Sequence, residues 1–469
     1  MKILPKVVIV ILVLVMAIQL VACGNNNAVV EDTTTAEIAD TIEQLTQDTS
    51  QTDTEEPQTT TEVVTTEAVT TAEPVIAEKY QVLNYSDFKA LWLSQYDLAN
   101  VYCTGSSQRS KQSFTTYIKK ILSNTKELGI NTVIVQVRPF ADSMYPSEYY
   151  PMSSMVVGSY GKDATYDAFA IIIEEAHALG LSVQAWINPM RAMLDSEIVK
   201  VNDKYLIKQW HSDSATRGKY VVKVSNRWYL NVAYEPVRQL IIDGAREIVE
   251  NYDVDGLHMD DYFYPTTESS FDAAAYSDYI RGGGRKALAD WRREQLNVLV
   301  SGLWSMVKQH DSDILFGISP AGNFNTVYNN QYADIYTWCA NEGYIDYICP
   351  QVYFGFEHGS CDFVKVSTTY QSMIKTDKVK LIIGMTLGKA LNGSKGTEDQ
   401  YAGSGKREWI ENKDILLRGL EYTKKLPKCT GVAYFCYQYF YDPISGTAVS
   451  GTKTERDNFL PVLKDISWQ

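Results

Sequence analysis

The chain has few of the residues that carry catalysis outside carboxylate chemistry. It holds five histidines and seven cysteines in 469 residues. None of them stands in a CxxC pair, a Cys/His cluster or an HExxH motif, so neither a zinc site nor any other metal site is expected. The sequence contains no GxSxG elbow and no P-loop, which argues against serine-hydrolase and nucleotide-dependent chemistry. We therefore expect no cofactor.

A basic surface is also missing. The chain has 43 basic and 57 acidic residues, a net charge of −14, so nucleic acid is not an expected partner. The acidity is unevenly spread: residues 24–79 carry a net charge of −12, and residues 80–469 carry only −4. The acidic segment contains fifteen threonines and no aromatic residue. Such a composition cannot form a packed core, so residues 23–79 are predicted to be a disordered linker.

The N-terminus resembles an export signal. Lys2 and Lys6 precede an apolar run from Val7 to Ala22, and Cys23 follows directly. A basic start, an apolar stretch and small residues before a cysteine predict a lipoprotein signal peptide over residues 1–22, with lipid added to Cys23. Acyl chains on that cysteine would hold the protein on the outer face of the cell membrane. An uncleaved anchor helix is the alternative, although the run is short for a membrane span.

The six remaining cysteines do not suggest a disulfide framework. An exported protein can form disulfides, but Cys103, Cys349 and Cys436 lie inside apolar runs that look like strands. We expect buried thiols rather than cystines at these positions.

From residue 95 onward the chain alternates short β-rich runs with longer helical patterns. Eight such units over about 370 residues predict a single α/β domain of the (β/α)8 barrel type over residues 80–469. Longer insertions follow the third strand (190–230), the fourth (262–285) and the seventh (390–408). The expected strands are 98–103, 131–138, 181–188, 253–261, 314–319, 345–353, 379–385 and 430–437. The clearest helical patterns are Thr115–Leu128, Asp167–Leu179, Pro236–Asn251, Lys286–His310 and Asp414–Lys424.

Strand residues in a barrel point alternately to the axis and to the helices. In the second strand, one set is all valine (Val133, Val135 and Val137), which suits the helix layer. The other set of each strand becomes polar or aromatic toward its C-terminal end, where barrel active sites form. The expected axis residues near that end are Gln136 and Arg138, Trp186 and Asn188, His258 and Asp260, and Gln351 and Tyr353.

Asp260 is the leading catalytic candidate. It ends the fourth strand in the motif VDGLHMDDYFYP, and strand parity directs it to the axis. Aromatic neighbours such as Tyr262 can raise the pKa of a carboxyl and make it a general acid. Asp261 is the second candidate and requires the backbone to turn into the loop there. The alternative for both residues is a strand-end aspartate that caps the next loop.

Other residues at the strand ends suit sugar binding. Arg138 and Arg191 can orient hydroxyls or carboxylates, and amides such as Asn188 can hold sugar hydroxyls. A structural alternative exists for each: an Arg138–Asp142 ion pair in the loop, an Asn188 loop cap, or packing of the aromatics. The expected binding residues are Gln136, Arg138, Trp186, Asn188, Arg191, His258, Tyr262, Asn323, Gln351, Tyr353 and Glu357.

The mechanism stays open at this stage. A two-carboxylate inverting scheme would pair Asp260 with Asp142 or Glu357, with the carboxyl groups roughly 6.5–9.5 Å apart. An N-acetyl group of the substrate attacking its own anomeric carbon is the alternative. No glutamate ends the seventh strand, which reads LIIGMTLG.

Six motifs carry a resemblance to a known family: QVRPFADSMYPS, LGLSVQAWINPMR, YDVDGLHMDDYFYP, WRREQLN, FGISPAGN and ICPQVYF. In this order, over about residues 95–440, they resemble the glycosyl hydrolase-like 10 family of bacterial lipoproteins. The resemblance implies a (β/α)8 barrel and a glycan substrate, since some members hydrolyse peptidoglycan strands. It also implies a cleft with Arg138, Asp142, Asn188, Arg191, His258, Asp260, Asp261, Asn323, Gln351 and Tyr353.

Two segments depart from the family pattern. The expected first strand reads LANVYCTGS instead of an Arg-Gly-Val-Trp-Leu type, and Phe354 stands where tryptophan is common. The sequence thus predicts a membrane-anchored, extracytoplasmic glycosidase for a cell-wall or related amino-sugar glycan. The alternatives are a glycan-binding lipoprotein without catalysis and an enzyme for dietary or host polysaccharides.

Overall fold

The structure is a computed structural model, and it describes residues 80–468. The predictions for the signal peptide, the linker and Cys23 fall outside these residues. Within residues 80–468, no helix combines the length and apolarity needed to cross a bilayer. The six described cysteines are not in disulfides, which agrees with the expectation of thiols rather than cystines; Cys103 is half-buried and the others are buried.

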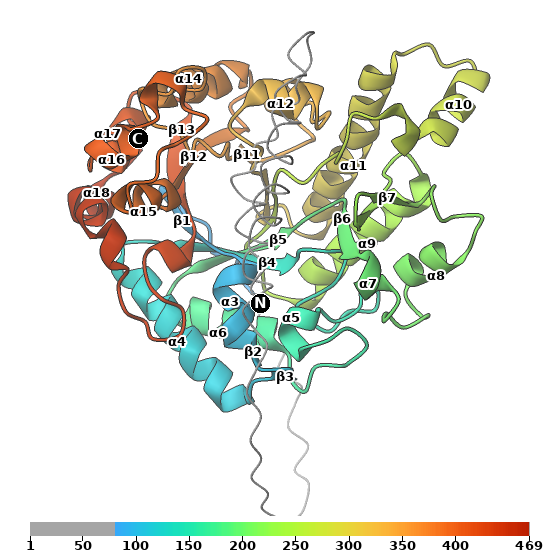
Figure 1. Ribbon diagram of the computed structural model, residues 1–469, viewed down its shortest axis with the longest axis horizontal. Helices are drawn as coiled ribbons and strands as arrows, with labels where there is room; N and C mark the ends of the chain where they lie inside the picture. The colour runs from blue at the N-terminus through green and yellow to red at the C-terminus, as the bar shows by residue number, and fades with distance from the viewer. Residues whose placement is uncertain (1–79, 469) are drawn as a thin grey trace, which may run out of the picture. The chain divides into compact units, whose positions relative to one another are not determined.

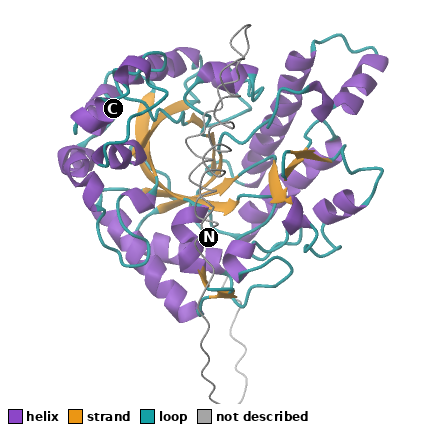
Figure 2. Ribbon diagram, in the orientation of Figure 1, coloured by secondary structure: helices purple, strands orange, loops and turns teal. Residues whose placement is uncertain are grey.

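Eight parallel strands close into a barrel, so the predicted fold class is confirmed (Figure 2). In spatial order the strands are β1-β13-β12-β11-β10-β9-β5-β4, and closure leaves no free sheet edge. Their bounds are β1 Phe88–Leu93, β4 Thr132–Arg138, β5 Ser182–Ile187, β9 Gly256–Met259, β10 Leu315–Ile318, β11 Tyr347–Ile348, β12 Lys380–Thr386 and β13 Cys429–Phe435.

Helices form the outer layer around this ring (Figure 1). The five helices predicted from the sequence are all present within one to four residues of the expected ends. The main helices are α4 Lys111–Glu127, α6 Ala168–Ala178, α9 Glu235–Asn251, α11 Leu288–His310, α13 Ile335–Ala340, α14 Phe363–Met373, α17 Ile415–Thr423 and α18 Lys453–Asp465.

The first predicted strand is wrong. Residues 98–103 belong mostly to helix α3 (Gln95–Tyr102), and β1 lies ten residues earlier. Ser94 begins α3 with a capping box, in which its hydroxyl accepts from the amide of Asp97 and the Asp97 carboxylate accepts from the amide of Ser94. Leu98, Val101 and Tyr102 are buried at helical spacing. The actual β1 reads FKALWL and ends in Trp-Leu, so the apparent departure from the family pattern at this strand disappears.

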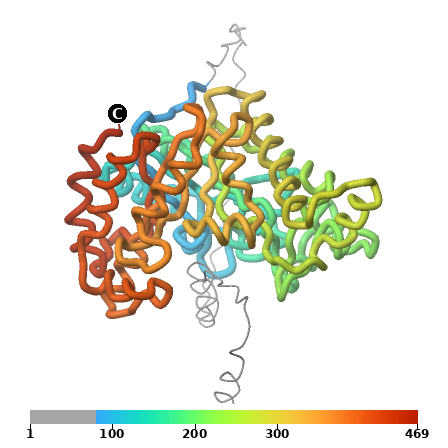
Figure 3. Tube along the Cα trace, turned by 90° about the horizontal axis from the view of Figure 1, so that it is seen from above, coloured from blue at the N-terminus to red at the C-terminus, as the bar shows by residue number. Residues whose placement is uncertain are grey.

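The insertions follow the third, fourth and seventh barrel strands, as predicted. After β5 the chain forms a three-stranded antiparallel sheet of β6 (Arg191–Leu194), β8 (Arg227–Leu230) and β7 (Val221–Val224), in that order. The insertion after β9 contains α10 (Ala273–Arg281), and the one after β12 contains α15 (Gly388–Ser394). The segments around the small sheet and α10, green to yellow, project from one side of the barrel (Figure 3).

Strand parity separates two apolar clusters. Val133, Val135 and Val137 belong to the large cluster between strands and helices, as predicted. A smaller cluster fills the barrel interior with alternate residues of the strands, including Trp92, Ile134, Trp186, Tyr347 and Cys349. The interior is therefore a packed core, and only its C-terminal end can serve as a site.

The described chain begins on the opposite, N-terminal end of the barrel. The carboxylate of Asp255, just before β9, accepts hydrogen bonds from the Tyr80 hydroxyl at 2.7 Å and from the Leu83 amide at 2.5 Å. Tyr85 donates to the carbonyl of Gly180, just before β5. The blue start of the tube in Figure 3 lies at this end. Residues 80–85 therefore lie away from the C-terminal ends of the strands.

Gly317 gives room for an interior tyrosine. A Cβ at Gly317 would lie 2.0 Å from the ring of Tyr347, its neighbour in register on β11. We expect Gly317→Ala to destabilise the fold by about 1–3 kcal/mol through overpacking, measured by urea denaturation. Gly282→Ala is the matched control, because its nearest contact would be 3.4 Å; it should change stability by less than about 0.5 kcal/mol. Equal effects of the two substitutions would contradict this packing account.

Candidate active site

Asp260 lies immediately after β9, at the C-terminal end of the barrel, and its side chain is 2% exposed. Two donors from the neighbouring strand share one of its oxygens. The Trp186 indole N–H donates to Oδ2 at 2.9 Å, and the Asn188 amide Nδ2 donates to the same oxygen at 2.7 Å. The backbone N–H of Tyr262 donates to Oδ1 at 3.2 Å.

The register of the sheet explains this arrangement. Trp186 on β5 pairs with His258 on β9, so Asn188, two residues later, comes opposite Asp260. Gln136 on β4 pairs with Trp186 and donates from Nε2 to the Asn188 Oδ1 at 2.9 Å. Gln136 in turn accepts from the backbone N–H of Gln95 at 2.9 Å. A chain of hydrogen bonds thus fixes the Asn188 amide with its NH2 group toward Asp260.

The surroundings favour the protonated form of Asp260. Burial raises the pKa of Asp260 well above its ordinary value, and the negative charge of Asp261 raises this pKa further. The N–H donors of Tyr262 and Trp186 and the cation of Arg191 act in the opposite direction. Since Oδ2 already accepts two N–H donors, the acid proton belongs on Oδ1. The direction of this pKa shift is the one that a general acid requires.

His258 lies one layer below Asp260 and forms the floor of the site. It is fully buried, and burial lowers its pKa to about 3, so the ring is neutral. The Trp92 indole, which can only donate, faces Nε2 at 3.4 Å. Nδ1 therefore carries the hydrogen and donates to the Tyr347 hydroxyl at 2.8 Å. His258 supports the site from below and is not exposed to a substrate, unlike the sequence-based expectation.

Arg191, at the start of β6, borders the acid from the side. Its guanidinium carbon lies 4.4 Å from the ring centre of Tyr262 and 4.7 Å from that of Phe140. Its positive charge is one of the influences that lower the pKa of Asp260. Arg191 and Tyr262 are therefore at the site, as predicted, and both are half-buried.

The prediction that Arg138 lies on the barrel axis is wrong. A β-bulge sets Val137 and Arg138 of β4 against the single residue Ile187 of β5, which turns the Arg138 side chain outward. Its guanidinium lies 4.6 Å from the ring centre of Tyr150, under helix α9, where a Cβ at Gly244 would contact it. Strand alternation alone cannot anticipate such a bulge.

Asp142 also has a structural role and does not line a cleft. It is fully buried; its Oδ1 accepts from the Phe140 amide and its Oδ2 from the Tyr160 hydroxyl, both at 2.9 Å. Burial raises the pKa of Asp142. Its oxygens organise the loop that follows β4 and carries Phe140, so the structure does not bring Asp142 to Asp260 as a second carboxylate.

The remaining predicted residues lie at the ends of β10 and β11. Asn323 caps helix α12 (Phe324–Asn329) with its side-chain oxygen, which accepts from the Asn325 amide. Gln351 donates to the Ser319 carbonyl at 3.1 Å, and the Tyr353 ring packs 5.9 Å from that of Phe435. Glu357 is exposed on the following loop, where its backbone N–H donates to Glu408.

Asp261 is half-buried beside the acid. Its charge contributes to raising the pKa values of Asp260, Tyr262 and Tyr353. These three groups come from two strand ends, so the carboxylate faces the same mouth. Among the carboxylates considered from the sequence, Asp261 is the one that acts electrostatically on Asp260.

Several residues at the site were not anticipated. Trp92 was missed because β1 was misplaced, and Gln95 because its contribution is a backbone N–H. Arg227 and Tyr229 lie on β8, inside an insertion that no strand-end rule covers. The capping motif Ser94-x-x-Asp97 was the one available signal, since it would have located α3 and hence β1.

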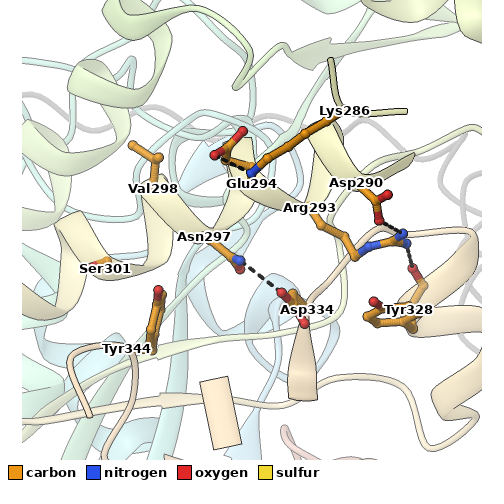
Figure 4. A pocket seen from close by; sticks show the side chains of 10 residues that line it. All are labelled: Lys286, Asp290, Arg293, Glu294, Asn297, Val298, Ser301, Tyr328, Asp334 and Tyr344. Carbon is orange, nitrogen blue, oxygen red and sulfur yellow. Dashed lines mark hydrogen bonds and ion pairs between the residues drawn. The ribbon is translucent and has the colours of Figure 1, made fainter. Parts of the chain in front are cut away.

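Cavities and clusters elsewhere do not compete with this site. A polar groove of about 730 Å³ lies along α11, lined by Lys286, Arg293 and Tyr328 among others (Figure 4). Neither Asp260 nor any of its hydrogen-bond partners lines it. Within residues 80–468, no group of three or more His, Cys, Asp or Glu side chains is arranged to hold a metal ion.

Comparison with known proteins decides the family. Residues 87–402 match the profile of the family described as "Glycosyl hydrolase-like 10". The chain belongs to this family. It is 33% identical over 304 residues to glycosyl hydrolase YngK of Bacillus subtilis (strain 168), covering 60% of this chain and 57% of YngK. It is 28% identical over 386 residues to glycosyl hydrolase DigH of Escherichia coli (strain K12), covering 77% of this chain and 85% of DigH.

Solved structures agree on the fold. The catalytic domain of a β-amylase from Paenibacillus polymyxa superposes with a TM-score of 0.51 at 11% identity, covering 81% of this chain and 99% of that one. A β-galactosidase from Rahnella sp. R3 gives 0.52 at 13% identity, covering 82% and 57%. The family and the names of its relatives bear out the predicted enzyme class, a glycoside hydrolase.

We expect Trp186→Phe to raise the pKa of Asp260 further. The indole N–H stabilises the ionised carboxylate, so its loss favours the protonated form. A general acid is active while protonated, and the rate falls as the pH rises through its pKa. The basic limb of the pH–rate profile for glycan hydrolysis should therefore move upward by about one pH unit.

Trp228→Phe is the matched control, because the Trp228 indole donates to Asp195 at 2.9 Å in the small sheet. It should leave the basic limb in place. A downward shift in Trp186→Phe, or the same shift in both variants, would contradict the assignment.

Proposed function

We propose that this protein is an extracytoplasmic, membrane-anchored glycosidase that cleaves a cell-wall or related amino-sugar glycan, with Asp260 as general acid. The observation that carries the proposal is the buried Asp260 carboxyl, which Trp186 and Asn188 hold and whose pKa burial raises. Asp142 is also buried, but its oxygens bind the loop that follows β4. Asp260 instead lies beside Asp261 and Tyr262 at the C-terminal end of the barrel.

The first chemical step follows from this geometry. The proton on Asp260 Oδ1 passes to the glycosidic oxygen, the bond from that oxygen to the anomeric carbon breaks, and Asp260 becomes ionised. The Trp186 and Asn188 donors then stabilise the new negative charge on Oδ2. These donors are already in place before the reaction, so little reorganisation is required.

The attack on the anomeric carbon is assisted either by Asp261 or by the substrate itself. Asp261 lies next to the acid, and its ionised form would favour a positive anomeric centre. In one scheme it activates the attacking water; in the other, an N-acetyl oxygen of the sugar attacks and Asp261 orients that group. Half-buried Tyr262 and Tyr353 supply aromatic surface for sugar rings.

The proposed anchor rests on the sequence around Cys23 and agrees with the way the chain enters the barrel. Residues 80–85 dock on the N-terminal end through Asp255, away from Asp260. A lipid attached upstream would thus be compatible with an open catalytic end. An enzyme held on the outer face of the cell membrane is within reach of a cell-wall glycan.

We expect Asp260→Asn to abolish glycan cleavage while folding and glycan binding persist, because the amide cannot donate an acid proton. The loss should reach about 10²–10⁴-fold. The measurement is reducing-end release from purified peptidoglycan strands, with and without stem peptides. Unchanged turnover would overturn the acid assignment. Binding without release by the wild-type protein would favour a glycan-binding lipoprotein.

Substitutions of Asp261 and Asp142 should have different effects, the first on kcat and the second on stability. Asp261→Asn should lower kcat about 100-fold and, by removing a like charge, lower the pKa of Asp260 and shift the basic limb downward. Asp142→Asn should cost about 1–3 kcal/mol of stability in urea denaturation and preserve the kcat of the folded protein. Loss of kcat in Asp142→Asn at wild-type stability would contradict this division.

A further inference from the structure

The small sheet after β5 presents a cationic face to the catalytic end. Arg191 on β6 pairs with Tyr229 on β8, and Arg227, two residues before Tyr229, shares that face. The alternate β8 residues, Trp228 and Leu230, are buried on the other face. The three residues Arg191, Arg227 and Tyr229 are half-buried. In Figure 1, β6 of this sheet lies beside β4 and β5.

Both arginines stack on one aromatic ring. The guanidinium carbons of Arg191 and Arg227 lie 4.7 Å and 4.5 Å from the ring centre of Phe140, and Arg191 also lies over Tyr262. Arg227 donates one N–H to the carbonyl of Ala192 at 2.8 Å. Stacking occupies the faces of a guanidinium and leaves its edge N–H groups for a planar anion.

Within the described residues, no carboxylate forms an ion pair with either arginine. Among residues 80–468, Arg191 has no hydrogen-bond acceptor and neither arginine has a carboxylate oxygen within 4 Å. Burial favours the neutral form of Asp260, and its oxygens accept from Trp186, Asn188 and Tyr262. Glu197 is the acidic group that acts on Arg227; it accepts from the Leu194 amide. Burial lowers the pKa of Arg227, and the Arg191 cation lowers it further, so an anion between them is favoured.

We propose that Arg191 and Arg227 form a subsite that binds a carboxylate carried by the glycan beside the scissile bond. The proposal rests on the glycosidase function proposed above and narrows its substrate to acidic glycans. A carboxylate can accept paired N–H bonds from the edge of a guanidinium. Two sources share this chemistry: a lactyl ether on an amino sugar and a uronic acid in the chain.

Another stacked arginine, Arg293, has its charge and hydrogen-bond donors paired within the protein. Arg293, in the groove of Figure 4, lies 4.1 Å from the ring centre of Tyr328 but also pairs with Asp290 at 2.6 Å and donates to the Tyr328 carbonyl. Its charge and its donors are satisfied within the protein. Arg293→Gln is therefore the matched control for loss of a stacked arginine.

The experiment compares Arg227→Gln, Arg191→Gln and Arg293→Gln on three substrates. These are peptide-free peptidoglycan strands with lactyl carboxylates, the same strands with the carboxyls converted to amides, and oligosaccharides that alternate uronate and N-acetylglucosamine. The first two variants should raise KM for the acidic strands at least about tenfold and leave KM for the amidated strands within about twofold. Arg293→Gln should change neither. Arg227→Lys should restore part of the preference, since it keeps the charge.

The outcomes separate the two proposals. Equal KM changes on acidic and amidated strands would mean that the arginines only hold the sheet, and this would overturn the subsite. Preference for lactyl or for uronate strands supports it and identifies the source. Binding of the three substrates to Asp260→Asn, with and without Arg227→Gln, gives the same comparison without turnover. Charge-dependent binding without cleavage by the wild type would remove the glycosidase proposal and keep the carboxylate site.

Discussion

The interaction on which the site depends is the sharing of one Asp260 oxygen by two N–H donors from the adjacent strand. Trp186 and Asn188 can both reach Oδ2 only because β5 and β9 are parallel and in a register that sets Trp186 beside His258. Burial raises the pKa of Asp260, whereas the Trp186 donor lowers it and both donors fix the position of the carboxyl. The carboxyl is therefore fixed in place while its protonated form is favoured.

The interior residues beneath this carboxyl also contribute to its desolvation. Gln136, Trp186, His258, Gly317 and Tyr347 follow one another around the barrel in register. The absence of a side chain at Gly317 admits the Tyr347 ring, which bonds the neutral His258, and Trp92 completes the floor. A charged or hydrated floor would weaken the desolvation of Asp260. The packed interior is thus part of the electrostatics of the site.

Above the acid, the small sheet supplies what the barrel strands lack. The strand ends hold carboxyl and amide groups, and the insertion brings guanidinium groups that are pinned on aromatic rings. An insertion can change without disturbing the register of the barrel, because its strands pair only with one another. The proposed carboxylate subsite and the proposed acid therefore reside on separate elements, which meet at Phe140 and Tyr262.

The sequence by itself determined the eight-unit barrel and the polar ends of its strands. It also determined that Asp260, Asn188, Trp186 and Gln136 are neighbours, because alternation within a strand is local and regular. Only the tertiary structure decided three matters. A bulge, which depends on pairing with a second strand, turned Arg138 outward. Loop hydrogen bonds buried Asp142. The approach of Arg227 to Arg191 joins residues 36 positions apart through antiparallel pairing, and no local pattern encodes such a contact.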